Sequence, residues 1–164
     1  MRHKYAYLQK EIERAVMKLD IKAIENGKFA RFEDSYDFSE MEFYGRFPIA
    51  EPLVFRGQVT RRAGGWMLEG ELSTNLHLIC DRCLQPFQRV KTLPVTQGLE
   101  LSLQNEERDD IIVCPKGLCD LQEIAETEWV LDMEYQDLCN EACKGLCAIC
   151  GCDFNQGSCE HIQA

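Results

Sequence analysis

The stretch Trp66-Met-Leu-Glu-Gly-Glu-Leu-Ser-Thr-Asn-Leu-His-Leu78 carries the clearest structural signal in this chain of 164 residues. Apolar and polar side chains alternate along most of it, and the apolar set is Trp66, Leu68, Leu72, Leu76 and Leu78. Successive side chains of a strand point to opposite faces of a sheet. The alternation therefore predicts a long strand with one buried and one solvated face.

The neighbouring segments extend this strand into a sheet. Residues 53–61 alternate in the same way, and a turn at Ala63-Gly64-Gly65 joins them to the long strand. Two alternating segments joined by a glycine-containing turn predict a β-hairpin. Residues 86–103 carry a further alternation, which predicts one or two more strands.

The hydrophobic period changes at Asp120. Asp120 and Glu123 have the spacing of an N-capping pair, which satisfies free backbone N–H groups at the start of a helix. Apolar residues then recur at helical spacing to about Met133, namely Leu121, Ile124, Ala125 and Trp129. The predicted fold class is α+β: an antiparallel strand meander with a packed helix and a C-terminal cysteine-rich zinc-binding module.

Charge and cysteines divide the chain near residue 119. Residues 120–164 hold one basic residue against ten acidic ones, so they carry nearly all of the formal net charge of −10. The same segment contains six of the ten cysteines. We predict an N-terminal helical extension at 1–16, an α+β body at 17–137 and an acidic, cysteine-rich zinc module at 138–164.

The cysteine-rich tail predicts a zinc site. Cys147-Ala-Ile-Cys150-Gly151 has the form of a zinc knuckle, because two residues between thiolates let a tight turn direct both sulfurs at one ion. The glycine relieves crowding by accepting unusual dihedral angles. One zinc with surplus ligands is expected, with Cys152 as a spare thiol. The candidate metal ligands are Cys139, Cys143, Cys147, Cys150, Cys159 and His161.

Other interpretations of these cysteines have less support. Reduced thiols in an unstructured tail, or a disulfide knot, are minor alternatives, because the chain shows no signal peptide and clustered thiols in a reducing compartment more often bind metal. The spacing of Cys143, Cys147 and Cys150 also matches radical-SAM iron–sulfur sites, but that chemistry needs a large α/β barrel, which the chain lacks. We expect a cytoplasmic protein with a structural zinc ion.

Cys80-Asp-Arg-Cys83 follows the long strand directly. It is a weak redox motif, because redox C-x-x-C thiols lie where a strand enters a helix, whereas the sequence that flanks Cys80 and Cys83 is strand-like. It can be half of a metal site, whose other half is either Cys114 with Cys119 or thiols of the tail. It can equally be two small residues that shape a hairpin turn. The sequence leaves the choice open.

Several function classes are excluded or disfavoured. The excess of acidic residues disfavours a general phosphate-binding surface, since nucleic-acid affinity rests on Lys and Arg. No apolar run reaches the roughly 18 residues that span a bilayer. No Ser-His-Asp arrangement, phosphate-binding glycine loop or apolar carboxylate pair is present, so we expect no enzymatic activity. A thiol oxidoreductase or nuclease that uses Cys80 or Cys83 is a remote alternative.

The order of motifs resembles the YceD family, a bacterial domain-of-unknown-function family linked to accumulation of large-subunit ribosomal RNA. The resemblance begins near Met17-Lys-Leu-Asp-Ile-Lys22 and continues through Cys80-Asp-Arg-Cys83-Leu-Gln-Pro-Phe87. It ends in Cys143-Lys-Gly-Leu-Cys147-Ala-Ile-Cys150-Gly151 and the residues to Cys159. His161 stands where the family usually has a final cysteine, a change that still permits zinc ligation.

The resemblance implies a non-enzymatic factor for ribosome biogenesis, often encoded beside a small basic protein of the large subunit. The acidic module is then expected to bind a basic large-subunit ribosomal protein, since opposite potentials steer association. The alternative is a zinc-containing module that binds precursor ribosomal RNA directly. The basic residues of the body that this alternative would use are Arg56, Arg61, Arg62, Arg82, Arg89 and Lys91.

Overall fold

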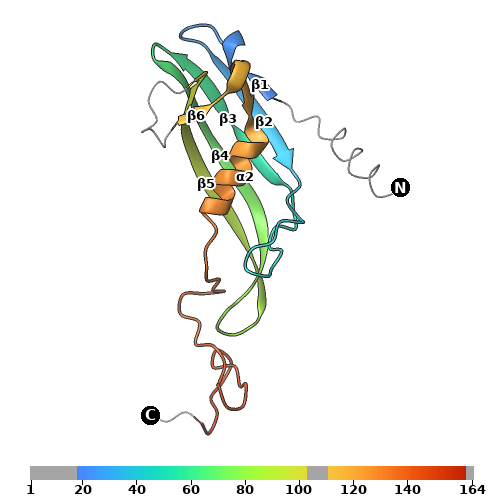
Figure 1. The fold of residues 1–164 in the computed structure, drawn as a ribbon. Helices are drawn as coiled ribbons and strands as arrows, with labels where there is room; N and C mark the ends of the chain where they lie inside the picture. The colour runs from blue at the N-terminus through green and yellow to red at the C-terminus, as the bar shows by residue number, and fades with distance from the viewer. Residues whose placement is uncertain (1–17, 103–110, 162–164) are drawn as a thin grey trace, which may run out of the picture. The chain divides into compact units, whose positions relative to one another are not determined.

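The structure, a computed structural model, describes residues 18–102 and 111–161. The extension predicted at 1–16 lies outside the described residues. Figure 1 shows a sheet, one helix, and a C-terminal chain that has neither. The elements are β1 (Lys18–Asp20), a 3-10 turn (Ile21–Ala23), β2 (Phe29–Tyr36), β3 (Leu53–Arg62), β4 (Gly65–Ile79), β5 (Pro86–Glu100), β6 (Ile111–Val113), a 3-10 turn (Pro115–Gly117), β7 (Leu118–Asp120) and α2 (Leu121–Leu131).

The predicted hairpin is confirmed as β3 and β4. The two strands are neighbours in the sheet and are joined by the two residues Ala63 and Gly64, a connection that only antiparallel strands can use. Along β4 every apolar residue of the predicted inward face is buried, whereas Glu69 and His77 on the opposite face are exposed. Thr74 is buried on the inward side, and its hydroxyl donates to the carbonyl oxygen of Glu51 at 3.0 Å.

The five-stranded sheet has the order β2-β3-β4-β5-β6. The alternation at 86–103 forms one strand, β5, of 15 residues. The expected all-antiparallel meander is wrong at one edge, because β6 pairs with β5 in parallel, with Leu99 opposite Ile112. The sheet is therefore mixed, and the α+β class is confirmed as mostly sheet with one helix among the described residues.

Strand β2 at the other edge was not predicted. Its residues are alternately exposed and half-buried, and none is fully buried. An edge strand needs few apolar side chains, so its pattern is hard to tell from a polar loop. A second, two-stranded sheet pairs β1 with β7 in antiparallel fashion, with Leu19 opposite Cys119.

The helix predicted after Asp120 is confirmed as α2. The Asp120 carboxylate accepts a hydrogen bond from the backbone N–H of Glu123 at 3.1 Å, as the capping pair predicts. The apolar residues at helical spacing are all buried, and Trp129 is fully enclosed. Contacts along β5 hold the helix: Gln97 donates to the Glu128 carboxylate, and the Lys91 ammonium lies 5.5 Å from the centre of the Trp129 ring.

The described residues form two compact units. One draws on residues up to 32, 56–70 and 94–128, and the other on 33–55, 71–93 and 129 onwards. In the first unit Val59, Leu68, Val95, Leu99 and Leu121 are at most 2% exposed. In the second the side chains enclosed to the same extent include Phe55, Leu72, Leu76, Trp129, Cys80 and Cys83. Cys80 and Cys83 thus belong to the core of the second unit.

Candidate metal centres

The turn between β4 and β5 directs two thiols to one side. The backbone N–H of Leu84 donates to the Cys80 carbonyl oxygen at 2.9 Å, and the N–H of Cys80 donates to the Gln85 carbonyl oxygen at 3.0 Å. These two bonds close the chain around Cys80 and Cys83. Leu84 has a φ of 59°, a left-handed conformation that a side chain disfavours and that the tight turn requires.

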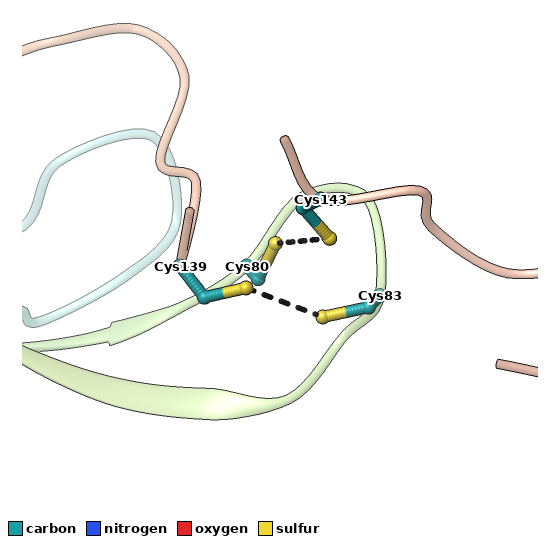
Figure 2. Close-up of side chains that lie close together, drawn as sticks. All are labelled: Cys80, Cys83, Cys139 and Cys143. Atoms are coloured by element: carbon teal, nitrogen blue, oxygen red, sulfur yellow. Dashed lines mark hydrogen bonds between the residues drawn. The ribbon is translucent and has the colours of Figure 1, made fainter. Parts of the chain in front are cut away.

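Two cysteines from the chain after α2 complete a group of four. Figure 2 shows sulfur atoms from the β4–β5 turn and from the C-terminal chain pointing toward one another. All four lie within 4.8 Å of each other. The Cys80 and Cys143 sulfurs are 3.8 Å apart, and those of Cys83 and Cys139 are 3.7 Å apart. We call this group the first cluster: Cys80, Cys83, Cys139 and Cys143.

The spacing of the sulfurs suits a tetrahedral metal ion. With metal–sulfur bonds of about 2.3 Å, the sulfurs of a tetrahedral centre lie about 3.8 Å apart. The sulfur–sulfur separations of 3.8 Å (Cys80–Cys143) and 3.7 Å (Cys83–Cys139) match this edge length. A disulfide would need about 2.05 Å, and all ten cysteines are free. The first cluster can therefore hold one metal ion.

Backbone N–H groups favour thiolate in the first cluster. Burial opposes ionisation of Cys80, but hydrogen bonds from backbone N–H groups, led by that of Cys139, prevail and lower the pKa of this thiol to about 6. The neighbouring Cys80 sulfur, and after it burial, raise the pKa of Cys139 to about 12. The cluster thus combines a ready thiolate with a thiol whose proton a metal ion would displace.

An ion-pair network joins the β4–β5 turn to the chain just before Cys139. The backbone N–H of Asp137 donates to the Asp81 carboxylate at 2.7 Å, and the N–H of Asp81 donates to the Asp137 carbonyl oxygen at 2.8 Å. Arg46 pairs with Asp81, and Arg89 pairs with Asp137 at 2.8 Å. The guanidinium of Arg46, and after it the Asp137 N–H, hold the pKa of Asp81 below its ordinary value. These contacts position Cys139 beside the turn.

Arg82 makes a second connection between the same two segments. Its guanidinium donates to the carbonyl oxygens of Glu141 at 3.2 Å and Cys143 at 3.0 Å. Its own carbonyl oxygen accepts from the N–H of Leu146 at 3.1 Å. Gly145 has a φ of 75°, and a β-carbon there would lie 3.0 Å from the Arg82 carbonyl oxygen. The glycine lets the tail approach the turn closely.

A second group of four ligands lies within the tail. The side chains of Cys147, Cys150, Cys159 and His161 have ligand atoms within 4.8 Å of one another, and we call them the second cluster. The N–H of Gly151 donates to the Cys147 carbonyl oxygen at 2.9 Å, and Gly151 has the positive φ, 72°, that the knuckle pattern predicted. The backbone N–H groups of Cys150 and Ile149 lower the pKa of Cys147 to about 6.

Asn155 connects the second cluster's loop to the first cluster. Its side-chain amide donates to the Cys143 sulfur at 3.4 Å, and its side-chain oxygen accepts from the N–H of Lys144 at 2.8 Å. Asp153 orients it by accepting from both its backbone and its side chain. An N–H donor at a thiolate stabilises the charged form. Sequence reasoning assigned no role to Asn155, since its role depends on contacts eleven and twelve residues away.

The remaining cysteines take no part in either cluster. Cys114 and Cys119 are buried, and hydrogen bonding between the two thiols lowers the pKa of Cys114 and raises that of Cys119. They are therefore not the partners of Cys80 and Cys83, which the structure pairs with thiols of the tail. Cys152, expected to be a spare thiol, belongs to neither group.

The arrangement of the clusters prompts comparison with known proteins. A family model described as "Large ribosomal RNA subunit accumulation protein YceD" matches residues 68–164. The chain belongs to the YceD family. The resemblance carried by the cysteine motifs is thereby confirmed. Neither the search of curated proteins nor that of solved structures found a match.

The match to the YceD family covers both clusters. All eight ligands, from Cys80 to His161, fall within the matched residues, together with β5, β6, β7 and α2. The name of the family points to a role in large ribosomal subunit RNA accumulation. Among the described residues of this YceD-family chain, no helix is long and apolar enough to cross a membrane.

The predicted ligands are distributed differently from expectation. One site with surplus ligands was expected in the tail, whereas the structure sorts the candidates into two groups of four. Cys139 and Cys143 join the turn cysteines, and Cys147, Cys150 and Cys159 join His161. That these residues bind a metal ion stays a prediction, which the geometry of both groups permits.

Proposed function

We propose that the protein is a non-enzymatic factor of large ribosomal subunit production that binds a basic ribosomal protein through its acidic C-terminal segment, residues 120–164. Two zinc ions hold this segment in shape, and the protein acts in the cytoplasm, where thiols stay reduced. The observation that carries the proposal is the joint placement of charge and ligands. The segment with ten acidic residues and one basic residue also holds six of the eight candidate ligands.

Zinc suits both ligand sets. Four thiolates, or three thiolates and one imidazole, in a closed tetrahedral arrangement are the usual ligands of structural zinc. Backbone N–H groups stabilise one thiolate in each cluster, at Cys80 and Cys147. Zinc with four thiolates leaves a net negative charge, so metal binding adds to the acidity of the segment.

The C-terminal chain needs such an ion for its structure. Residues 132–161 contain no helix or strand and only one isolated bridge, between Leu146 and Asp153. A segment of this kind gains little from hydrophobic burial. A structural zinc site contributes on the order of 10 kcal/mol in small peptides, which is enough to order it.

The acidic side chains are placed to meet a partner. Six of the ten are exposed on the helix and in the tail: Glu123, Glu126, Asp132, Glu134, Glu141 and Glu160. Opposite charge on a basic ribosomal protein would speed encounter and favour this partner over acidic ones. The interaction is then expected to weaken as salt is added.

The alternative, direct binding of precursor ribosomal RNA, has less support. Most of the basic residues that would contact phosphate are engaged within the protein. Arg61 lies over the Trp66 ring at 3.8 Å, Arg62 pairs with Glu69, and Arg82 donates to two carbonyl oxygens of the tail. Filter binding separates the two functions: tight binding of RNA alone, lost when Arg61, Arg62 and Arg82 are neutralised, would favour the alternative.

Retention of purified large-subunit ribosomal proteins by the immobilised zinc-loaded chain tests the proposal. We expect a basic ribosomal protein to be retained at about 50 mM salt and released at about 500 mM. Replacing the exposed Glu126, Glu141 and Glu160 by Gln should reduce retention several-fold. The matched control replaces the exposed Glu25, Glu33 and Glu42 by Gln and should not. No salt-sensitive retention of a basic ribosomal protein would overturn the proposal.

A further inference from the structure

A pocket beside the first cluster has no role in holding metal. Its volume is about 330 Å³, at the lower end of the range for ligand sites. The loop around Tyr44 lines one side, and residues 133–137, just before Cys139, line the other. All of its lining residues belong to the same compact unit. A cavity of this size suits one side chain of a partner protein.

Tyr44 stands at the pocket in a conformation that a side chain disfavours. The backbones of Phe43 and Arg46 exchange two hydrogen bonds, of 2.7 and 3.0 Å, around a two-residue turn. Tyr44 and Gly45 in that turn have φ values of 51° and 79°. Such turns usually carry Asn or Gly at the Tyr44 position. A strained residue at a pocket points to function, because stability alone would favour another residue.

Two exposed aromatic rings meet at the pocket. Tyr44 is 68% exposed and Tyr135 is 83% exposed, although large aromatic side chains usually gain from burial. Their ring centres are 5.3 Å apart and their planes meet at 80°. In such an edge-to-face pair each ring keeps at least one face that the other ring does not cover.

The charges of the pocket select a cation. Three carboxylates line it, those of Asp81, Glu134 and Asp137, against the single cation Arg46. Arg46 is directed toward Asp81 and lies 3.9 Å from Asp137, so it is committed to these two groups. Glu134 is the most exposed of the three, and its carboxylate accepts from Arg89 at 3.1 Å. A phosphate or other anion would meet net negative charge here.

We propose that this pocket receives an arginine or lysine side chain of the partner protein, between the tyrosine rings and the Glu134 carboxylate. Cations are attracted to the faces of tyrosine rings, and more strongly when water is excluded. Exposed acidic residues of the tail, which belongs to the same compact unit as the pocket, attract the same kind of partner, so charge complementarity is not confined to the pocket. The inference rests on the proposed function and names the point at which the basic partner is anchored.

Two probes applied to the full zinc-loaded chain test the inference. The first is methylguanidinium, titrated while the ring resonances of Tyr44 and Tyr135 are followed by NMR, with methylurea as its neutral isostere. We expect both tyrosines to shift with methylguanidinium and neither to shift with methylurea. Shifts with adenosine in place of methylguanidinium would identify a base-stacking pocket and overturn the inference.

The second probe is a 12-residue peptide of alternating Arg and Ser, whose affinity is measured by fluorescence anisotropy. Tyr135→Ala should weaken binding about three- to tenfold. Tyr44→Asn should weaken binding while raising the unfolding temperature, because Asn tolerates the left-handed conformation. Phe29→Ala, at an exposed aromatic residue outside the pocket, is the control. Unchanged affinity in both tyrosine variants would overturn the inference but leave the proposed function intact, whereas failure of the wild-type chain to bind would count against both.

Discussion

The two clusters differ in what they connect. The first cluster joins thiols 56 and 63 residues apart, whereas the second is contained in residues 147–161. Three of the four ligands of the first are buried, against one of the four in the second. By chain-entropy estimates, a cross-link that closes a loop of about 60 residues, as in the first cluster, stabilises the fold by about 4 kcal/mol. A cross-link that closes the nine-residue loop from Cys150 to Cys159 stabilises it by about 3 kcal/mol. Two sites with the same number of ligands thus differ in what they stabilise: one connects distant segments of the chain, and the other a single short segment.

The surroundings sharpen this difference. Phe87, Leu138 and Leu146 pack against the buried thiols of the first cluster, and Arg82 and Asp81 hold its two segments together. In the second cluster Cys150 and His161 are exposed. We infer that the first cluster is part of the core and holds the tail against the β4–β5 turn. The second cluster stabilises only the local conformation of the tail.

Breaking the first cluster should have the largest effect. Cys143→Ser removes one of four ligands in a buried site, so we expect the zinc content to fall from two ions to one. We also expect the free energy of unfolding to fall by several kcal/mol, since a structural zinc site contributes on the order of 10 kcal/mol. Metal analysis and thermal unfolding measure both. Cys152→Ser, the same change outside both clusters, should lower neither, and an equal loss in the two variants would contradict the comparison.

Breaking the second cluster should have a smaller and local effect. His161→Ala should also remove one zinc ion, but the unfolding of the sheet should change by no more than about 1 kcal/mol, because its ligands lie outside the core. Hydrogen exchange should increase in residues 147–159 only. His77→Ala, at an exposed histidine of β4, is the control. A collapse of the whole fold in His161→Ala would show that the two clusters are not independent.

Removing the Arg82 side chain tests what fastens the tail. Arg82→Gln leaves the carbonyl oxygens of Glu141 and Cys143 without their charged donor, at a cost of about 1–3 kcal/mol. A chelator should then remove zinc from the first cluster faster and from the second at an unchanged rate. Arg62→Gln, at a surface ion pair with Glu69, should alter neither rate. Equal acceleration at both clusters would go against the assignment.

Of the four changes, removing the Asn155 amide should have the smallest effect on zinc retention. Asn155→Ala deletes the amide's hydrogen bonds to the Cys143 sulfur and to Asp153, and the one from Lys144. The two bonds with Cys143 and Lys144 are together worth about 1–2 kcal/mol. Zinc should remain in both clusters but be lost from the first at a lower chelator concentration. Gln156→Ala, which loses a bond to Asp153 alone, serves as the control. Earlier loss from the second cluster would place Asn155 there.

The regular elements were predictable where local pattern and burial coincide. The alternation of apolar and polar residues in β4 and the helical spacing of apolar residues in α2 match the buried faces that the structure shows, and Asp120 caps α2 as predicted. Strand β2 was not predicted because no side chain in it is fully buried, and β6 was not predicted because it has only three residues. The parallel pairing of β6 with β5 depends on tertiary contacts that the alternation of apolar and polar residues does not encode.

The metal ligands, too, could be grouped from the sequence only where they lie close together along the chain. Spacing identified Cys147 and Cys150 as neighbours in one turn, which the structure shows. Spacing could not show that Cys139 and Cys143 meet the β4–β5 turn, because that depends on the length of β4 and the path of the chain after α2. A four-residue spacing can place two side chains on one helix face, but the structure has no helix at Cys139 and Cys143.

The zinc content of the intact chain tests the central claim of two separate four-ligand centres. Native mass spectrometry of protein purified under reducing conditions gives the number of ions per chain directly. The account predicts two zinc ions in the wild-type chain, one in Cys143→Ser and one in His161→Ala. One ion or none in the wild-type chain would contradict it.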